Sequence, residues 1–558
     1  MTGAIRRRRT MGWAVGLILL AWRPCAAEDV GLRDDFSGYA AESDGAPRWA
    51  VQDGQWRVQA GVYEQSDPTR EGVVTFSAGP DFGDLRFSVR FRIEPVGSGV
   101  RAAGMVFRSA DSQSYYYVHF DSRFSQVILV KHTRARPWME LFRTRGIPIK
   151  PGEWHVGLVE CDGSHFRVSL DGARVGEGDD REFPVGRIGL RARQGKVQFD
   201  DVLVEGRPQK PQKEWTLMKP DTEVGVPRLE SAERIVAVQG GGYFPVLIRL
   251  KDGRLGAVVR GGAGHLGIKG RLDWISSADG GKTWSAPAVI VDSEFDDRNP
   301  SLGQAADGTI LVGYAEASTY NAQGQFDMKS GKYELFTVAS RDGGKTWSTK
   351  RPMNIREYPQ GSVFGRAIVL PDATLLMPVY WSGCGVLRSR DNGETWGDPS
   401  SLAPDRDEFS LVRLPSGRLV AMARSNGLTG YHSDDAGRTW KQTAKVTKPN
   451  QHPADLCLLK SGAILLVYGS RIEPYGVGAM LSRDGGQTWD HKHRVMLAWD
   501  SQNADTGYPS AVQLDDGTIV VLYYAVGTYG LLPGKEQAVC IRFTEKQLDE
   551  TGARAKGE

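Results

Sequence analysis

One eight-residue segment recurs five times in the second half of this 558-residue chain and constrains the fold more than any other feature. Every copy follows the pattern Ser-x-Asp-x-Gly-x-Thr-Trp. The copies, called turn signatures below, occupy residues 277–284, 340–347, 389–396, 433–440 and 482–489. Their first residues lie 63, 49, 44 and 49 positions apart. A period of roughly 40–60 residues that always ends in the same turn predicts an array of β-sheet blades.

Each turn signature has the chemistry of a tight hairpin. Glycine accepts a positive φ without steric cost, and the Ser, Asp and Thr side chains can bond the backbone of the turn. The Trp is a large apolar side chain that can fill the space between neighbouring sheets. The same turn repeated around a ring cannot form one active site, so we expect structural roles for its aspartates, which are Asp279, Asp342, Asp391, Asp435 and Asp484.

The chain is too long for a single hydrophobic core and is rich in glycine, with 68 residues. Short alternating runs such as residues 85–91 and 166–170 predict a β-sandwich over residues 30–206. A polar, proline-containing linker follows at 207–222. The region 223–545 holds all five signatures and has room for six four-stranded blades. The predicted fold is therefore all-β: an N-terminal β-sandwich jelly roll, a C-terminal six-bladed β-propeller, and a polar tail at 546–558.

The first 27 residues have the pattern of an export signal. Four arginines at 6–9 precede a short apolar run at 11–22, and Cys25-Ala26-Ala27 provides small residues for cleavage. The apolar run is too short to span a bilayer, so no stable membrane insertion is expected. Removing this segment removes five arginines and no acid, and the net charge falls from +3 to about −2. The sequence therefore predicts a secreted or periplasmic protein that does not bind nucleic acid.

No cofactor or metal is predicted from the sequence. There is no phosphate loop, nucleotide fingerprint or metal-ligand spacing. Four cysteines remain after the signal segment, scattered singly on strand-like runs, and we expect buried thiols, with one disulfide as the alternative. These are Cys161, Cys384, Cys457 and Cys540. The oligomeric state does not follow from these patterns.

These patterns resemble two known families. The sandwich is similar to jelly rolls of the laminin-G or concanavalin type, some of which bind carbohydrate. The five signatures in a six-bladed array resemble the sialidase (neuraminidase) superfamily, whose propellers carry Asp-box (BNR) repeats. That second resemblance implies a retaining exo-glycosidase in which a tyrosine attacks the anomeric carbon, a glutamate takes its proton, and arginines hold the substrate carboxylate.

Four positions match the catalytic segments of the sialidase family. Glu408 precedes a strand, a turn and a second strand that ends near Arg424, as the family's glutamate does. Tyr508, in Gly507-Tyr508-Pro509-Ser510, resembles the nucleophile segment. Arg471, eleven residues before the last turn signature, resembles the third arginine. The resemblance thus implies a Tyr508–Glu408 nucleophile pair, with Arg424 and Arg471 binding the substrate anion.

Two positions depart from the family pattern. Tyr243, in Tyr243-Phe244-Pro245, stands where the first arginine is expected. The acidic residue expected before the first signature is absent, and His265 is the nearest titratable side chain, so it becomes the candidate general acid. Arg298, before Asn299-Pro300, is an additional charge, and we expect it to compensate for the missing arginine.

Three further residues are predicted at the rim of the same pocket. Asp297 and Glu316 are alternative acids, and Arg366 is a further substrate-binding candidate. The predicted function is a secreted exo-glycosidase of sialidase type that removes a terminal sialic acid or another acidic or deoxy sugar from a glycan. The alternatives are a non-catalytic carbohydrate-binding propeller and a propeller of the photosystem-assembly or sorting-receptor kind.

Overall fold

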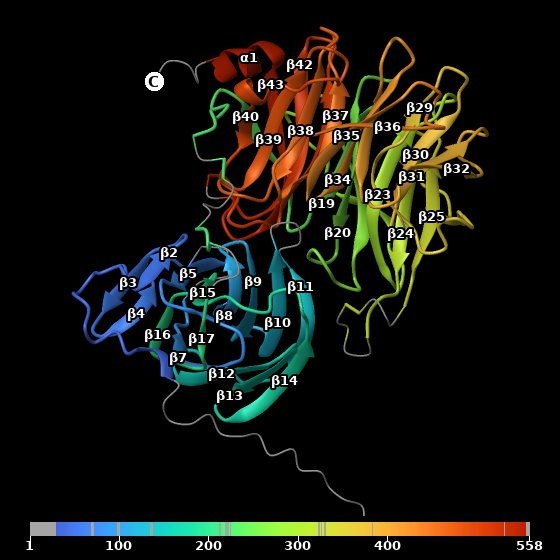
Figure 1. Cartoon of the computed structure of the whole chain (residues 1–558). Coiled ribbons are helices and arrows are strands. Elements are labelled where there is room, and N and C mark those ends of the chain that lie inside the picture. The colour runs from blue at the N-terminus through green and yellow to red at the C-terminus, as the bar shows by residue number, and fades with distance from the viewer. Residues whose placement is uncertain are drawn as a thin grey trace, which may run out of the picture.

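Strands make up almost all of the regular structure of this chain (Figure 1). The computed structural model describes residues 30–553, except residues 69–71, 97–100, 134–137, 211–213, 218–221, 224, 322–323, 325, 328–330, 382 and 529. The predicted export signal at 1–27 lies outside the described residues. A sandwich precedes a six-bladed propeller, which confirms the predicted all-β class.

Two antiparallel sheets form the N-terminal sandwich. The first, in spatial order, contains β14 (Ala173–Asp179), β13 (His165–Leu170), β12 (Trp154–Asp162), β7 (Leu85–Ile93), β16 (Val197–Glu205), β4 (Val62–Gln65) and β3 (Trp56–Gln59), with β1 (Val30–Asp34) on β16. The second contains β11 (Met139–Arg145), β10 (Gln126–Thr133), β9 (Ser114–Asp121), β8 (Ala102–Asp111), β15 (Arg187–Arg193), β5 (Val73–Ser77) and β2 (Trp49–Val51). A short pair joins β6 (Asp81–Phe82) and β17 (Pro208–Gln209).

The alternation seen in the sequence explains the sandwich core. Along β7 every second side chain is buried, from Leu85 to Ile93, because successive side chains of a strand point to opposite faces. These residues pack against the inner face of the second sheet, which contributes Phe107, Tyr116 and Phe120.

Six sheets arranged as blades form the C-terminal propeller. Blade 1 contains β19 (Tyr243–Arg249), β20 (Leu255–Gly261), β21 (Arg271–Ser277) and β22 (Ala288–Val291). Blade 2 contains β23 (Asp296–Gln304), β24 (Ile310–Ala317), β25 (Tyr333–Ser340) and β26 (Arg351–Pro352), with β28 (Gly365–Arg366) beside β23. Blade 3 contains β27 (Ser362–Val363), β29 (Ile368–Val369), β30 (Leu375–Tyr380), β31 (Cys384–Ser389) and β32 (Gly397–Ala403).

Blades 4, 5 and 6 complete the ring. Blade 4 contains β33 (Phe409–Arg413), β34 (Leu419–Ser425), β35 (Gly427–Ser433) and β36 (Lys441–Lys445). Blade 5 contains β37 (Gln451–Leu458), β38 (Ile464–Ser470), β39 (Gly476–Ser482) and β40 (Val495–Ala498). Blade 6 contains β41 (Thr506–Gln513), β42 (Thr518–Val526) and β43 (Glu536–Thr544). The outermost strand of blade 6 is β18 (Glu233–Gln239), which pairs with β43. A segment that precedes blade 1 in the sequence therefore closes the ring, and closure removes the exposed sheet edges.

The turn signatures have the hydrogen bonds expected from their residue types. In the first copy, Asp279 accepts hydrogen bonds from the backbone N–H of Thr283 at 2.9 Å and from its hydroxyl at 2.6 Å. The Ser277 hydroxyl accepts from Gly281 N–H at 2.8 Å. Trp284 packs against the core shared by blades 1 and 6, together with Val520 and Cys540. The signatures thus join neighbouring blades and do not form a common site.

The structure differs from the predicted polar tail. Residues from Glu545 to Ala553 form the helix α1, whose Leu548 is buried against blades 5 and 6. A residue such as Leu548 is enough to anchor a short helix when a hydrophobic surface is available, although the segment is mostly polar. The four cysteines Cys161, Cys384, Cys457 and Cys540 are buried thiols without a disulfide.

The segment between the domains contacts both of them. Trp215 packs edge-on against Phe76 of the sandwich, with ring centres 5.2 Å apart. Further along, the buried carboxylate of Glu223 pairs with Arg494 at 2.8 Å and with Lys448 at 2.6 Å, both on the propeller. In Figure 1 the two domains lie side by side, joined through this segment.

Candidate active site

Irregularities in the innermost strands of four blades create the site. The pairing register shifts within β19, β23, β37 and β41, and a proline occupies each shift. Proline lacks an N–H and is tolerated where the ladder is interrupted, and such bulges redirect side chains. In three blades the residue before the proline has a positive φ, namely Phe244 at 52°, Asn299 at 54° and Tyr508 at 49°.

The Tyr508 side chain meets Glu408 from blade 4. The Tyr508 hydroxyl donates a hydrogen bond to Glu408 Oε1 at 2.7 Å, although the two residues are 100 positions apart. Only about one-twentieth of either residue is exposed, at 6% and 5%. The structure therefore brings together the two groups that the sequence analysis assigned to the nucleophile pair.

The electrostatics of this pair favour an ionised glutamate and a neutral tyrosine. Burial, together with the Glu408 charge, raises the pKa of Tyr508 to about 12. Burial opposes ionisation of Glu408, but the Arg424 guanidinium and the Tyr508 hydroxyl hold the pKa of its carboxyl below its usual value. At neutral pH the tyrosine thus keeps its proton, and an acceptor for that proton lies within hydrogen-bond distance.

Two arginines flank the pair. Arg424 Nη1 donates to both oxygens of Glu408, at 2.9 and 3.0 Å, and lies 3.1 Å from the Tyr508 hydroxyl. The Arg471 guanidinium carbon lies 5.4 Å from the centre of the Tyr508 ring, and Nε donates to the carbonyl of Thr506 at 3.3 Å. Arg471 Nη2 has no hydrogen-bond partner among the described residues. Arg471 can therefore still donate to a bound anion.

His265 forms a second pair beside the first, with Asp505. Its Nδ1 lies 2.7 Å from Asp505 Oδ1, and the hydroxyl of Tyr524 donates to the same oxygen at 2.6 Å. Burial opposes ionisation of Asp505, but His265 and Tyr524 hold the pKa of its carboxyl below its usual value. His265 is partly exposed, at 38% of its side chain. The other ring nitrogen is therefore able to meet a ligand, with Asp505 fixing the ring.

Phe244 connects the two pairs. Its ring centre lies 4.8 Å from that of Tyr508 and 5.1 Å from that of His265. The Arg298 guanidinium carbon lies 5.8 Å from the same ring. An aromatic surface thus stands between the nucleophile and the histidine, in blade 1, with a cation beside it.

Arg298 is held by a buried charge network. Its Nη1 lies 3.2 Å from Asp296 Oδ2, and its Nη2 donates to the carbonyl of His265 at 3.3 Å. Asp296 also pairs with the fully buried Arg260 at 2.6 Å and accepts from the Tyr320 hydroxyl at 2.5 Å. One carboxylate therefore neutralises only one of two guanidinium groups. Arg298 Nε has no hydrogen-bond partner among the described residues.

Comparison with family models places this site in a known kind of propeller. Residues 274–521 match the model of the BNR repeat-like domain. This match covers most of the propeller and none of the sandwich. The sandwich, at residues 33–205, matches the model of the 3-keto-alpha-glucoside-1,2-lyase-like domain.

Two curated relatives share sequence with this chain. A protein named sialidase from Bacteroides fragilis is 25% identical over 291 residues, which is 44% of this chain and 52% of the relative. A sialidase from Paraclostridium sordellii is 26% identical over 198 residues, 30% of this chain and 48% of the relative. The chain thus spans about half the length of the curated relatives that it matches.

Several solved structures align with the chain. A protein of unknown function from Dyadobacter fermentans is 24% identical, with a TM-score of 0.49, over 56% of this chain and 98% of that one. A leech intramolecular trans-sialidase is 14% identical, with a TM-score of 0.44, over 84% and 95%. A mutant of the NanB sialidase from Streptococcus pneumoniae is 11% identical, with a TM-score of 0.45, over 83% and 95%.

Tyr243 lies next to the aromatic side chains around His265. It is buried, and its ring centre lies 4.8 Å from that of Tyr524 and 6.2 Å from that of His265. It supports those rings from behind, whereas the neighbouring Phe244 contacts Tyr508. The position of the expected arginine is thus occupied by aromatic surface.

Three predicted residues lie apart from the cluster. Asp297 accepts hydrogen bonds from Ser293 N–H at 2.7 Å and from its hydroxyl at 2.9 Å, since it points to the opposite face of β23 from Arg298. Burial raises its pKa to about 6. Glu316 pairs with Lys350 at 2.7 Å.

Arg366 is also directed elsewhere. Its guanidinium donates to the carbonyl of Ala511 at 2.9 Å and pairs with Asp455 at 3.0 Å. Asp455 in turn accepts from the Ser410 hydroxyl at 2.6 Å and from Ala511 N–H at 2.8 Å. This network connects β28 with blades 4, 5 and 6 and does not include Tyr508.

Sequence analysis missed Asp505, Tyr524, Phe244 and Asp296. Asp505 lies three residues before Tyr508, so its closeness to the nucleophile was visible in the sequence. Its hydrogen bond with His265 joins residues 240 positions apart and could not be seen in the sequence. The Arg260–Asp296 pair has no local signature either. It joins neighbouring blades, and only the fold brings the two charges together.

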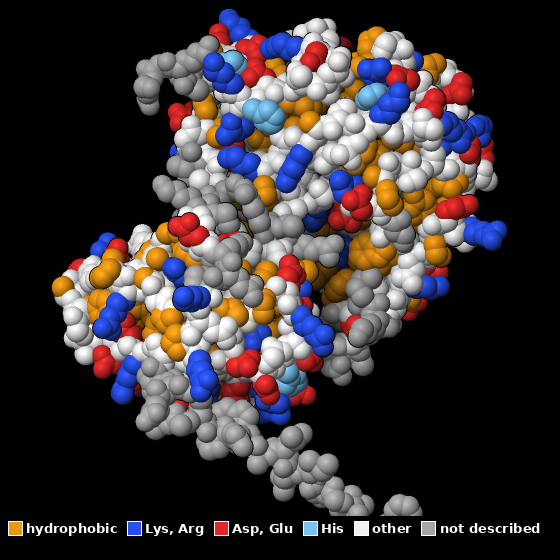
Figure 2. Space-filling view, viewed as in Figure 1, with side chains coloured by type: hydrophobic (Ala, Val, Ile, Leu, Met, Phe, Trp, Pro, Cys, Tyr) orange, Lys and Arg blue, Asp and Glu red, His pale blue; other side chains and the backbone are white. Residues whose placement is uncertain are grey.

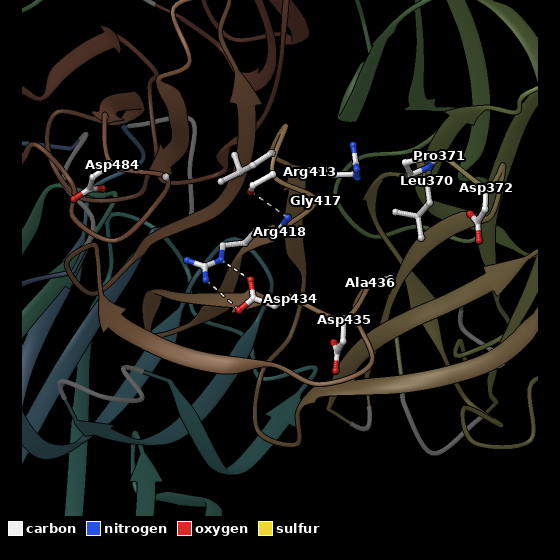
Figure 3. Close-up of a pocket in the computed structure, with 13 residues that line it drawn as sticks. Leu370, Pro371, Asp372, Arg413, Gly417, Arg418, Asp434, Asp435, Ala436 and Asp484 are labelled. Atoms are coloured by element: carbon white, nitrogen blue, oxygen red, sulfur yellow. Dashed lines mark hydrogen bonds and ion pairs between the residues drawn. The ribbon is translucent and has the colours of Figure 1, made fainter.

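A separate hollow of about 840 Å³ lies at the other end of the strands (Figure 3). It is lined by Arg413, Arg418 and Asp434, among others, and Figure 3 shows Arg418 paired with Asp434, at 2.7 Å. Glu408 immediately precedes β33 and Arg413 ends it, so the hollow and the nucleophile pair lie at opposite ends of that strand.

Neither a metal centre nor a membrane span occurs in the part of the chain that the structure describes. Among those residues, no three His, Cys, Asp or Glu side chains gather in a way that could hold a metal ion. None of the helices there is long and apolar enough to cross a bilayer. Figure 2 shows basic and acidic side chains interspersed over the visible face.

Proposed function

We propose that the protein is a sialidase-type exo-glycosidase that hydrolyses a terminal acidic sugar with retention of configuration. The observation that carries this proposal is the 2.7 Å hydrogen bond from a neutral, buried Tyr508 to an ionised Glu408. The sequence similarity to proteins named sialidase supports the same chemistry. Arg298 and Arg471 each have a buried donor without a hydrogen-bond partner among the described residues, which supports an anionic substrate.

The first step forms a covalent intermediate. Tyr508 Oη attacks the anomeric carbon while its proton passes to Glu408, and the bond from that carbon to the leaving oxygen breaks. His265 gives a proton to the leaving oxygen, and Asp505 holds the ring in position through its hydrogen bond to Nδ1. A neutral phenol is suited to attack beside a carboxylate, because an anionic nucleophile would be repelled by it.

The second step reverses these roles. His265 takes a proton from water, and the resulting hydroxide attacks the anomeric carbon. The bond to Tyr508 breaks, and the phenolate recovers its proton from Glu408. Arg424 stays within 3.1 Å of the tyrosine oxygen and stabilises negative charge on it in both steps. Two displacements at one carbon give retention.

The test is hydrolysis of a panel of aryl glycosides, namely an α-sialoside, uronides and deoxyhexosides, by the intact protein. Tyr508→Phe should lower kcat by at least about a thousandfold on the substrate that is cleaved. Tyr314→Phe is the matched control, because Tyr314 is also buried and also donates to a glutamate, Glu316, at 3.2 Å, but lies outside the cluster. It should retain activity.

Each outcome has a distinct meaning. Hydrolysis of the sialoside identifies sialic acid as the substrate, whereas hydrolysis of a uronide alone identifies another acidic sugar. Cleavage of a neutral deoxyhexoside alone contradicts an acidic substrate. No cleavage of any glycoside, with sugar binding retained, replaces the proposal with a non-catalytic carbohydrate-binding propeller, which the missing blade-1 arginine would then explain.

We also propose that the protein acts outside the cytoplasm. The basic and apolar pattern of residues 1–27 supports export. Mass spectrometry of the protein recovered from its native host should give an N-terminus at or near Glu28. A mature chain that retains residues 1–27 and stays in the cytoplasm would contradict export.

A further inference from the structure

Trp381 is an unusual residue at the edge of the candidate site. It directly follows β30 in blade 3, and 39% of its surface is exposed. Its φ is 118°, in a region that favours glycine and that a bulky side chain rarely adopts. Residues held in such conformations cluster at active sites and ligand-binding sites, where the surrounding structure keeps them in place. Exposure and backbone strain together therefore call for an explanation at this position.

Trp381 does not stand alone. Its ring is stacked on Tyr333, with ring centres 4.7 Å apart and planes 25° from parallel. Tyr333 is almost completely buried, at the start of β25 in blade 2. Tyr333 thus covers one face of the indole, and the exposed area belongs to the remainder of the ring. A rigid aromatic surface is presented to solvent across the junction of blades 2 and 3.

Contacts on both sides link this stack to the site. In blade 3, the residue before Trp381 is Tyr380, whose hydroxyl accepts a hydrogen bond from Asn299 at 2.9 Å. Tyr380 belongs to the same packed cluster of buried side chains as Phe244 and Tyr508. The rings of Tyr380 and Trp381 are 6.4 Å apart.

In blade 2 the connection runs through strand pairing. Asp296 is opposite Ala317, and Ala317 is opposite Tyr333. Tyr333 is therefore two strands away from the carboxylate that holds Arg298, which is about 10 Å. Trp381 thus lies at the rim of the site, next to Tyr380 and farther from Tyr508.

We propose that Trp381, supported by Tyr333, is the stacking surface for the first sugar of the leaving group, the pyranose to which the terminal sugar is attached. This inference rests on the proposed glycosidase function. A pyranose presents C–H groups on its less polar face, and these pack on a preordered aromatic ring. Because Tyr333 and the backbone fix the indole in advance, little side-chain freedom is lost on binding.

Kinetics with two leaving groups test the proposal on the intact protein. Trp381→Ala should lower kcat/KM for 3′-sialyllactose by about tenfold, equivalent to about 1.4 kcal/mol, and change that for methyl α-sialoside by less than about twofold. Trp381→Phe should recover most of the loss. Trp138→Ala, which removes a tryptophan of similar exposure (38%) from the sandwich, should affect neither. Equal losses on both substrates, or no loss on either, would overturn the proposal.

Lactose binding separates failure of this inference from failure of the proposed function. If the wild-type protein cleaves neither sialoside, the sialidase assignment fails. Lactose binding, followed by tryptophan fluorescence, still tests the stacking surface formed by Trp381. A saturable change in fluorescence that occurs in wild type and Trp138→Ala but not in Trp381→Ala supports Trp381 as the stacking surface. No saturable change in wild type, or the same change in all three proteins, contradicts it.

Discussion

Glu408, Tyr508 and Arg424 depend on one another for their protonation states. A buried glutamate alone would tend to hold its proton, and a buried tyrosine with no acceptor could not lose one. Arg424 lies within 3.1 Å of both and reverses the effect of burial on the glutamate. The three side chains therefore act as a unit whose pH behaviour can be measured.

The first prediction concerns the acid limb of the kcat/KM profile. Glu408 must be ionised to accept the tyrosine proton, and its pKa lies below the ordinary 4.5, so activity should be lost only below that pH. Arg424→Gln keeps Glu408 buried but removes the positive charge beside it. The pKa of Glu408 should then rise, because burial is no longer opposed by the Arg424 charge, and the limb should move to higher pH by the same amount.

The control for this prediction is Arg418→Gln, an exposed arginine at the opposite end of the blade. It should leave the limb in place. A lower rate for Arg424→Gln with an unmoved acid limb would show that Arg424 binds substrate without setting the charge of Glu408.

His265 leads to a prediction about leaving groups. A general acid matters most when the departing oxygen is a poor leaving group. His265→Asn should therefore slow the cleavage of alkyl glycosides by about a hundredfold or more, and that of dinitrophenyl glycosides much less. Asp505→Asn should produce the same pattern more weakly, because it removes only the group that orients the ring. Equal losses on both substrate types would exclude proton donation by His265.

Arg298 should determine the charge preference. It is buried beside Phe244, and its Nε has no hydrogen-bond partner among the described residues. Arg298→Ala should raise KM for an acidic glycoside by about 10–100-fold, since a charge-assisted bond in a desolvated site is lost. Arg298→Gln should recover part of the loss. An unchanged KM for both variants, measured at constant ionic strength, would place the substrate anion elsewhere.

At the scale of elements, the turn signatures and the strand bulges have separate tasks. The signatures hold blades together, and the bulges turn Phe244, Asn299 and Tyr508 away from regular strand geometry. The signatures were visible in the sequence because their hydrogen bonds are local, within four residues. The bulges were not, because a register shift depends on the partner strand.

The signature aspartates should contribute stability that depends on pH. The hydroxyl and N–H of Thr283 lower the pKa of Asp279 to about 2, against 3.8 in the unfolded chain. A lowered folded-state pKa means that the contribution is present above about pH 4 and is lost as the pH falls towards 2. Asp279→Ala should lower Tm by about 2–4 °C at pH 6, with the difference vanishing near pH 2.

The matched control is Lys282→Ala, an exposed position in the same signature. Its Tm should match that of wild type at both pH values. A Tm difference for Asp279→Ala that is the same at pH 6 and pH 2 would mean that the carboxylate charge is not the source of the stability.

The sequence predicted those parts of the site that follow recurring local patterns. Glu408, Arg424 and Tyr508 occur at fixed positions relative to strands and turns, and they come together as expected. Asp297 and Arg366 were placed in the pocket because they start strands, but strand alternation directs Asp297 to Ser293, and Arg366 reaches across to Asp455. The direction of a side chain at a strand start requires the register, which the sequence does not contain.

On the scale of the whole molecule, ring closure supports the strand that carries Tyr508. Strand β41, which carries Tyr508, belongs to the sheet that β18 completes. Alternate residues of an antiparallel strand donate to the partner, so prolines at two adjacent positions must remove at least one ladder bond. Replacing Arg234 and Ile235, which pair with Ile541 and Cys540, by proline should therefore cost about 1–3 kcal/mol, because a buried carbonyl of β43 loses its donor.

The double variant Arg234→Pro/Ile235→Pro should therefore unfold at lower temperature, and activity should fall in step with loss of β structure in circular dichroism. The double alanine variant keeps the backbone N–H groups and, like the proline variant, loses the Arg234–Asp500 ion pair, so the additional loss in the proline variant measures the ladder. Full stability of the proline variant would show that the ring closes without the β18–β43 ladder.

The order in which the chain is made gives this closure another meaning. The sandwich leaves the ribosome before the propeller, and among the described residues its strands pair with one another and with β17, which ends at Gln209. Strand β18 emerges next and has to wait for β43, which ends at Thr544, before it can pair. No nascent chain that stops short of blade 6 can assemble Tyr508 with Glu408. The proposed chemistry would thus begin only after synthesis has passed the last blade, and truncated chains should be inactive.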